Sequence, residues 1–225
     1  WAFGALSAGE ASLIKKGLAD TSVDLSELHL SYFFFNSPTD PLRNTAKDTV
    51  SLPTTASNYL ESGGNNLFTM FELASWTGAA PEALAPYENS SSIPSLNSAL
   101  AYEDTAHLQN ARFVSTADLD SVKKLIMEYG AVSSAFYYDS RYLSDSSGYY
   151  YPRVASYNNH IVTLVGWDDN YAAYHFKEGS RPSSPGAWIA KNSHGTSFGD
   201  GGYFYISYED KTLNNRKDAL SYAFD

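Results

Sequence analysis

Apolar residues recur at helical spacing in the first part of the chain. Residues 1–16 place Phe3, Leu6, Leu13 and Ile14 on one side, among small Ala, Gly and Ser residues. This pattern predicts a helix that is buried on several sides. Shorter helical segments follow, each preceded by polar residues able to cap a helix. They cover residues 24–28 with Asp24 as the expected N-cap, residues 67–76, and a segment that opens with the capping box Ser115–Asp118 and closes at Gly130.

The later part of the chain changes to short β-branched and aromatic runs bounded by Gly, Asp and Asn, which is typical of strands. Helices first and strands afterwards predict an α+β protein with a helical half and a sheet half. The Ser- and Pro-rich residues 89–97 favour a boundary between two subdomains, residues 1–100 and 101–225. Residues 219–225 alternate like an added edge strand. The other predicted strands cover residues 131–137, 160–167, 187–191 and 202–208.

Composition excludes several functions. Fifteen basic against 25 acidic residues give a net charge of −10, which repels a phosphate backbone, so we expect no nucleic-acid partner. No run approaches the ~20 apolar residues that span a bilayer, and we expect no membrane span in this chain. The chain has no cysteine, and none of its five histidines pair at a helical metal-ligand spacing, so we expect no metal or other cofactor. Trp1 and its neighbours form no basic leader, so any signal peptide lies upstream or does not exist.

Three separated segments carry candidate chemistry. Residues 159–167 read Asn-His-Ile-Val-Thr-Leu-Val-Gly-Trp and place His160 at the start of an apolar strand. Residues 188–195 read Trp-Ile-Ala-Lys-Asn-Ser-His-Gly and place Asn192 after another strand. In isolation, such a histidine is more simply a core residue and such an asparagine a turn former. The third segment is Trp-Ala-Phe-Gly at residues 1–4, which opens the predicted buried helix, where a positive helix end favours a thiolate.

Together these segments resemble papain-like cysteine proteases. That family carries Cys-Trp-Ala-Phe at the start of its central helix, then Asn/Asp-His-Ala-Val-x-x-Val-Gly-Tyr, then Lys-Asn-Ser-Trp-Gly. Weaker agreement follows the family's order as far as Tyr208, and the chain is most similar to divergent prokaryotic members without disulfides. The resemblance implies a papain-like fold, with a helical left half, an antiparallel sheet right half and a cleft between them. The weaker matches are Leu-Ser-Glu at 25–27, Ser-Gly-Gly-Asn at 62–65, Pro-Tyr at 86–87 and Tyr-Gly-Ala-Val-Ser at 129–133.

The resemblance also implies roles for particular residues. His160 is the expected acid and base, Asn192 orients it, and the nucleophilic cysteine would immediately precede Trp1. His194 and Phe198 stand where the family has tryptophans, and they are expected to shield the site. The pocket for the substrate side chain two residues before the cut bond would hold small and amide residues, with no demand for an acidic or large aliphatic group. The expected substrate-binding residues are Gly63, Gly64, Asn65, Asn66, Ala135, Asn158 and Asn159.

The absent cysteine leaves three explanations open. The chain is a cleavage or trimming product with the cysteine upstream, or an altered cysteine was omitted with everything before it, or the site has no cysteine and is inactive. The first predicts a cysteine endopeptidase acting through a thiolate acyl-enzyme, and the last an inactive module that binds peptide or protein in the same cleft. Expected partners are a peptide or protein substrate and the protein's own N-terminal segment or propeptide. The resemblance implies a secreted bacterial protein, extracellular or at the cell surface.

A second rival interpretation concerns the run Tyr149-Tyr150-Tyr151. Exposed tyrosines bind carbohydrate, so this run is also compatible with a glycan-binding surface, although loop and core packing is the simpler interpretation. A further departure from the family is the long separation between His160 and Asn192, which predicts an inserted loop over residues 171–186.

Overall fold

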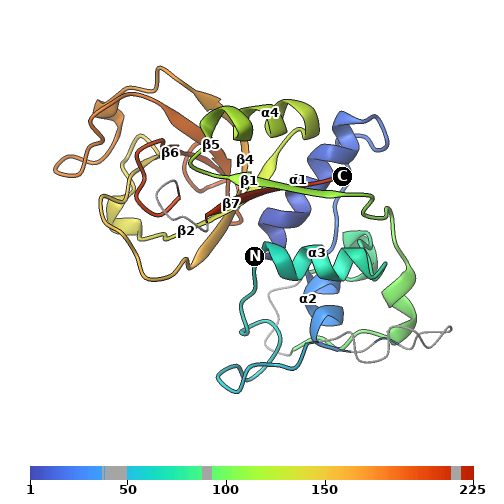
Figure 1. Ribbon diagram of the computed structural model, residues 1–225. Helices are drawn as coiled ribbons and strands as arrows, with labels where there is room; N and C mark the ends of the chain where they lie inside the picture. Colours follow the sequence, from blue (N-terminus) through green and yellow to red (C-terminus); the bar gives the residue numbers. More distant parts are fainter. Residues whose placement is uncertain (37, 39–49, 88–92, 214–218) are drawn as a thin grey trace.

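The computed structural model describes residues 1–36, 38, 50–87, 93–213 and 219–225. Four α-helices and a seven-stranded sheet form the described part of the chain (Figure 1), which confirms the predicted α+β class. The α-helices are α1 (Ala2–Lys15), α2 (Glu27–Phe35), α3 (Asn66–Ala74) and α4 (Leu119–Tyr129). The strands are β1 (Ala111–Ser115), β2 (Val132–Phe136), β3 (Gly148–Tyr149), β4 (His160–Asp168), β5 (Ala187–Lys191), β6 (Tyr203–Ser207) and β7 (Leu220–Phe224). Short 3-10 helices cover Glu82–Leu84, Ser98–Tyr102, Ser140–Tyr142 and Ala173–His175.

Helix α1 lies between the sheet and the helices α2 and α3 (Figure 1). Its small residues let it approach the sheet closely: a Cβ on Gly4 would lie 2.7 Å from a side-chain carbon of Ile161. The hydroxyl of Thr163 on β4 donates a hydrogen bond of 3.0 Å to the carbonyl of Gly4. The helix ends before Gly17, whose φ of 69° lies in the left-handed region. The pattern of small residues therefore reports a helix packed on several sides, as predicted.

Two helices begin at other caps than predicted. Helix α2 is capped by Ser26, whose hydroxyl accepts from the backbone N–H of His29 at 2.9 Å. Asp24 lies two residues before this cap, in a pairing with the segment near Pro81, where its carbonyl accepts from the Glu82 N–H. Helix α4 is capped by Asp118. The predicted cap Ser115 belongs instead to β1.

The strand order is β1-β7-β2-β4-β5-β6-β3. All neighbours are antiparallel except β3 and β6, which pair in parallel, so the sheet is mixed rather than purely antiparallel. The expected edge position of residues 219–225 is wrong, because β7 pairs with β1 on one side and with β2 on the other. The edge strands are β1 and β3, neither of which the hydrophobic pattern predicted. The proposed boundary near residue 100 stays a prediction.

The sheet buries its core against helices. Helix α4 packs Val122, Leu125 and Ile126 against side chains of the sheet, while Tyr222 and Phe224 of β7 belong to a cluster with α1. The predicted inserted loop packs through Tyr171, whose ring stacks on that of a β6 tyrosine with the centroids 4.4 Å apart. No described helix is long and apolar enough to cross a membrane.

The tyrosine run at residues 149–151 belongs to the interior. Tyr149 is fully buried and Tyr150 is 7% exposed, so these two rings pack rather than face solvent. Tyr149 also donates a hydrogen bond of 2.7 Å to the carbonyl of Tyr137. The core interpretation of these two rings is confirmed, and they offer no surface to a glycan.

Candidate active site

His160 and Asn192 meet at one end of the two neighbouring inner strands β4 and β5. His160 opens β4 and Asn192 follows the end of β5, and because these strands are antiparallel their opposite ends adjoin. His160 Nε2 lies 2.8 Å from Asn192 Oδ1. A carboxamide oxygen can only accept, so Nε2 carries the hydrogen and Nδ1 of His160 is left as the basic nitrogen. The arrangement supplies a neutral imidazole of defined orientation.

The surroundings favour that neutral form. Asn192 is 4% exposed and His160 is half-buried. Burial lowers the pKa of His160 below its ordinary value, the hydrogen bond to Asn192 opposes this, and positive charge on His194 lowers it further. Trp1 and His160 line the same cavity, so the start of α1 lies beside the imidazole.

Aromatic rings cover the pair. The ring of His194 lies 5.4 Å from that of His160, and the edge of Phe198 meets His194 at 5.2 Å, centroid to centroid. A third ring, which was not predicted from the sequence, is that of Tyr138 at 5.5 Å from His160. Tyr138 follows β2 by two residues, and the pairing of Phe136 with His160 is the signal that could have located it.

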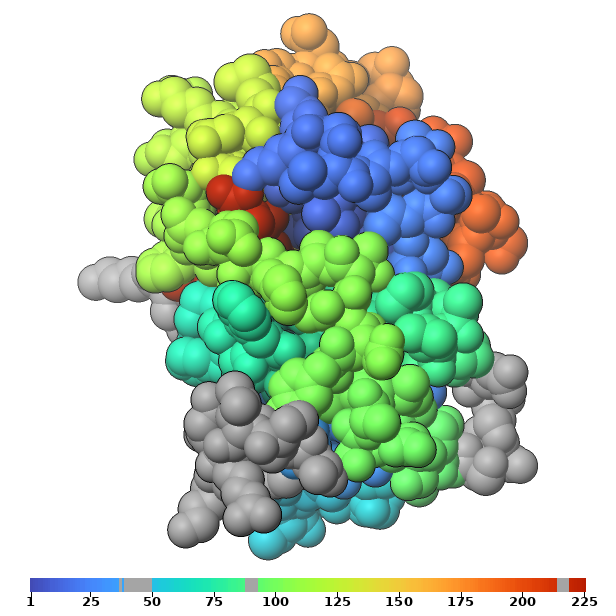
Figure 2. All heavy atoms as spheres, turned by 90° about the vertical axis from the view of Figure 1, so that its right-hand side faces the viewer, coloured from blue at the N-terminus to red at the C-terminus, as the bar shows by residue number. Residues whose placement is uncertain are grey.

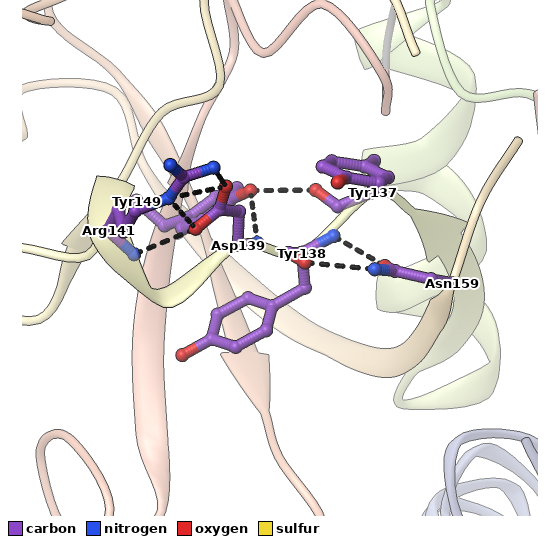
Figure 3. A network of polar contacts seen from close by, with 6 residues as sticks. All are labelled: Tyr137, Tyr138, Asp139, Arg141, Tyr149 and Asn159. Carbon is purple, nitrogen blue, oxygen red and sulfur yellow. Dashed lines mark hydrogen bonds and ion pairs between the residues drawn. The ribbon is translucent and has the colours of Figure 1, made fainter. Parts of the chain in front are cut away.

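Asn159 holds the Tyr138 backbone in place (Figure 3). The Tyr138 N–H donates to Asn159 Oδ1 at 2.7 Å, and Asn159 Nδ2 donates to the Tyr138 carbonyl at 3.0 Å. Asp139, the next residue, is paired with Arg141, which lowers the pKa of its carboxyl group. The Asn159 amide therefore fixes the turn that presents the Tyr138 ring to His160.

A cavity of about 430 Å³, which we call the cleft cavity, opens beside His160. It lies between the start of α1, the segment before α3, and strands β2 and β4. Six of the seven predicted substrate-binding residues line it. Its lining residues are Trp1, Gly63, Gly64, Asn65, Ala135, Asn158, Asn159, His160 and Ile161.

The seventh predicted residue, Asn66, does not line the cleft cavity. It is buried, its Oδ1 accepts from the Ser133 hydroxyl at 2.7 Å, and its Nδ2 donates to the Ser133 carbonyl at 3.2 Å. Both ends of its side chain are thus used to join α3 to β2. Asn66 connects the two halves beneath the cavity.

The floor of the cleft cavity is made of backbone and small groups. Gly64 lies against the Trp1 indole, and a Cβ there would come within 2.3 Å of the ring. The Asn65 side chain caps α3 and the Asn158 amide donates to the Ala135 carbonyl at 3.3 Å. Among the described residues, no acidic or basic side chain other than His160 belongs to the lining. The cavity therefore offers hydrogen-bonding backbone without a charged anchor.

A second cavity of about 420 Å³, the rear cavity, runs along α1 from Ala5 to Lys16. It shares no lining residue with the cleft cavity. Figure 2 shows this side of the molecule, with α1 in blue above the green segment that carries His107. Its walls are mostly leucine and alanine, among them Leu6, Leu13 and Leu73. Within the described residues, no three His, Asp or Glu side chains converge to hold a metal ion.

A helical half and a sheet half, with a histidine–asparagine pair at the cavity between them, define a papain-like architecture. The family model described as papain family cysteine protease matches residues 47–224. The chain therefore belongs to the papain family of cysteine proteases.

Solved structures agree with this assignment. The chain is 32% identical to a clostridial cysteine protease, Cwp84, after propeptide cleavage, with a TM-score of 0.80; it is covered fully and spans 52% of that chain. A structure of the protease and lectin-like domains of Cwp84, a surface layer associated protein of Clostridium difficile, gives 33% identity and a TM-score of 0.78, again with full coverage and 46% of that chain. Bromelain from Ananas comosus, at 19% identity and a TM-score of 0.64, covers 100% of this chain and 87% of its own and shares the fold alone. A search of curated proteins gave no match.

Proposed function

We propose that this chain is the major part of a cysteine endopeptidase whose nucleophile is a cysteine immediately before Trp1 in the full-length protein. The observation that carries the proposal is the 2.8 Å bond between His160 and Asn192 beside the start of α1. A helix start favours a thiolate, and His160 Nδ1 can hold the proton that the thiol releases. Asn192 acts through His160 and is a positioning residue.

The reaction is an acyl transfer. The thiolate attacks the peptide carbonyl carbon, and His160 gives its proton to the nitrogen of the leaving amine as the C–N bond breaks. Water, deprotonated by His160, then cleaves the thioester and restores the thiol. Acid–base help of this kind contributes roughly 10²–10⁴-fold.

The cleft cavity is the proposed substrate site. Gly63 and Gly64 offer backbone groups to an extended peptide, since nothing larger than hydrogen projects from them. The pocket for the side chain two residues before the cut bond would be bounded by Asn65, Ala135 and Asn158. Because these are small or amide residues, substrates with a neutral side chain of modest size should fit best.

The protein's location and partners belong to the same proposal. Two structures above 30% identity are of Cwp84, a surface layer associated protein, and one of them follows propeptide cleavage. We propose that this protein acts outside the cell or at its surface. Its N-terminal segment would be its first partner and would occupy the cleft until it is removed. Residues 1–100 and 101–225 would form the two subdomains of the catalytic unit.

Labelling of the protein with a thiol-reactive peptide, after the N-terminal segment that covers the cleft has been removed, tests the proposal. The expected result is one added label in the intact mass, located on the residue before Trp1, together with cleavage of a peptide substrate. The absence of cysteine from residues 1–225 favours one alternative, an inactive module that binds peptide in the same cleft. Peptide binding without a label and without cleavage would establish that alternative and refute the peptidase.

A further inference from the structure

The carboxamide of Asn192 is held at both ends. Its Oδ1 accepts from His160 and also from the backbone N–H of Ser193, at 2.9 Å. Because a backbone N–H can only donate, this second bond independently places the oxygen on the His160 side. The Nδ2 group must then point away from His160. Among the described residues its acceptor is Nδ1 of His194, at 3.3 Å.

This contact specifies the protonation state of His194. Asn192 Nδ2 is a donor, so Nδ1 of His194 must offer its lone pair, and the ring must be neutral with its hydrogen on Nε2. His194 is exposed, and it can exchange a proton directly with solvent. Histidine is the side chain that ordinarily changes charge between pH 5 and 8. A protonated ring would turn an N–H toward the N–H of a buried amide, which would then lack an acceptor.

We propose that His194 is a positioning residue, whose neutral ring fixes the Asn192 carboxamide and thereby His160, and whose protonation in acid releases both. This inference rests on the proposed peptidase function, because it assigns His194 a role in the same site. It also explains why histidine differs from tryptophan here. An indole offers only a donor, so it can cover the pair but cannot accept from Nδ2.

No other titratable group near His194, Asn192 and His160 in the described residues can take the positioning role proposed for His194. Within the described residues, the titratable groups beside His194 are His160 on β4 and Tyr138 after β2. Burial raises the pKa of Tyr138, so its phenol stays neutral across the range in question. Positive charge on His194 also lowers the pKa of His160, which acts in the same direction as the lost hydrogen bond. Protonation of His194 therefore acts on His160 in two ways: it removes the contact that holds Asn192, and its charge lowers the pKa of His160.

The pH dependence of kcat/KM in the full-length enzyme tests the proposal. His194→Gln keeps an acceptor for Asn192 Nδ2 but does not titrate, whereas His194→Phe keeps a covering ring without an acceptor. We expect His194→Phe to lower kcat/KM at pH 7 by roughly 3- to 10-fold and His194→Gln to recover most of that loss. On the acid side of its pH profile, kcat/KM of His194→Gln should depend on one proton fewer than in the parent enzyme, and its fall should begin at a lower pH. His107→Gln, in the rear cavity, is the matched control and should keep the parent profile.

Equal kcat/KM and equal acid limbs for the Gln and Phe variants would overturn the proposal and leave His194 as a cover. A second measurement does not need turnover: the ¹⁵N chemical shifts of the histidine rings and of the Asn192 side-chain amide. We expect the Asn192 amide to shift as His194 titrates, and to stay constant in His194→Gln. An Asn192 amide that ignores His194 would also overturn the proposal. If the amide responds but no peptide is cleaved, the positioning contact stands and the peptidase function fails.

Discussion

The two cavities beside α1, one at its start and one along its length, have nearly the same volume, about 430 and 420 Å³, but opposite chemistry. The cleft cavity is floored by glycine and amide backbone and meets an imidazole held by Asn192. The rear cavity is walled mainly by aliphatic side chains, and its histidine, His107, pairs with Asp104 and stacks on Trp76. Cavity volume therefore does not identify the candidate active site. What identifies it is a set of converging polar groups in which Nδ1 of His160 is left as the basic nitrogen.

The helix itself differs between its start and its middle. Gly4 lies where α1 presses on β4, so that any side chain there would collide with Ile161. Gly9 lines the rear cavity, and a Cβ there would meet nothing within 4 Å. Close packing at the first end fixes the position of Trp1 relative to His160. Further along, α1 is packed closely again, because a Cβ on Gly130 would lie 2.8 Å from the Ala11 carbonyl oxygen.

The largest expected effect comes from a substitution that removes the acid–base group of the cleft cavity and leaves the rear cavity unchanged. His160→Ala in the full-length protein should lower kcat/KM by at least roughly 10³-fold, because no other group can hold and return the proton. The melting temperature should change little, since His160 is half-buried at a strand end. Peptide turnover and circular dichroism check this. His107→Gln is the control, and retained turnover in His160→Ala would remove His160 from the mechanism.

Removing the orienting amide should have a smaller effect. Asn192→Ala leaves His160 present but free to rotate and to change tautomer, and we expect kcat/KM to fall roughly 10- to 100-fold. Stopped-flow measurement of the acylation step separates this from a loss of substrate binding. An unchanged acylation rate would show that another group orients the imidazole.

A matched pair of variants compares a packed and an open position of α1. Gly4→Ala should lower the free energy of unfolding by roughly 1–3 kcal/mol, because the added methyl group collides with Ile161 in a packed interface. Gly9→Ala should instead raise it by up to about 1 kcal/mol, since alanine favours the helix and the space is open. Urea denaturation of both variants gives the comparison. If both variants change the free energy of unfolding equally, then α1 is not packed more tightly at Gly4 than at Gly9.

The smallest effect is expected from filling the rear cavity. Ala106→Phe adds an aromatic ring to its wall and should change kcat/KM by less than about twofold, because the cavity shares no residue with the cleft. Steady-state kinetics with the same peptide substrate would measure it. A large loss of activity would show that the two cavities are coupled through α1.

The sequence predicted most elements but not all of their partners. Periodicity located the helices and five of the seven strands, because side-chain burial repeats within each element. It could not place residues 220–224 between β1 and β2, since strand pairing depends on residues far away in the chain. It missed β1, where burial alternates only weakly, and the two-residue strand β3. The caps Ser26 and Asp118 were misassigned because Asp24 and Ser115 are engaged by distant segments.

For the site, the sequence motifs pointed to His160 and Asn192, and these two side chains do lie in contact. Local sequence could not show that Asn66 is buried against Ser133, or that Tyr138 faces His160, because both contacts join separate elements. Nor could it show that His194 accepts from Asn192. That depends on which way an amide points, which only the surrounding donors determine.

The central place of β7 bears on the order in which this protein is made and becomes able to act. Residues 220–224 join β1 to β2, and two of them, Tyr222 and Phe224, pack with α1. A nascent chain that has not yet delivered this strand leaves both neighbours unpaired and α1 without part of its support. The cleft can thus be completed only after β7 has been synthesised, and under the proposed peptidase function a nascent chain without this strand would not yet be able to act.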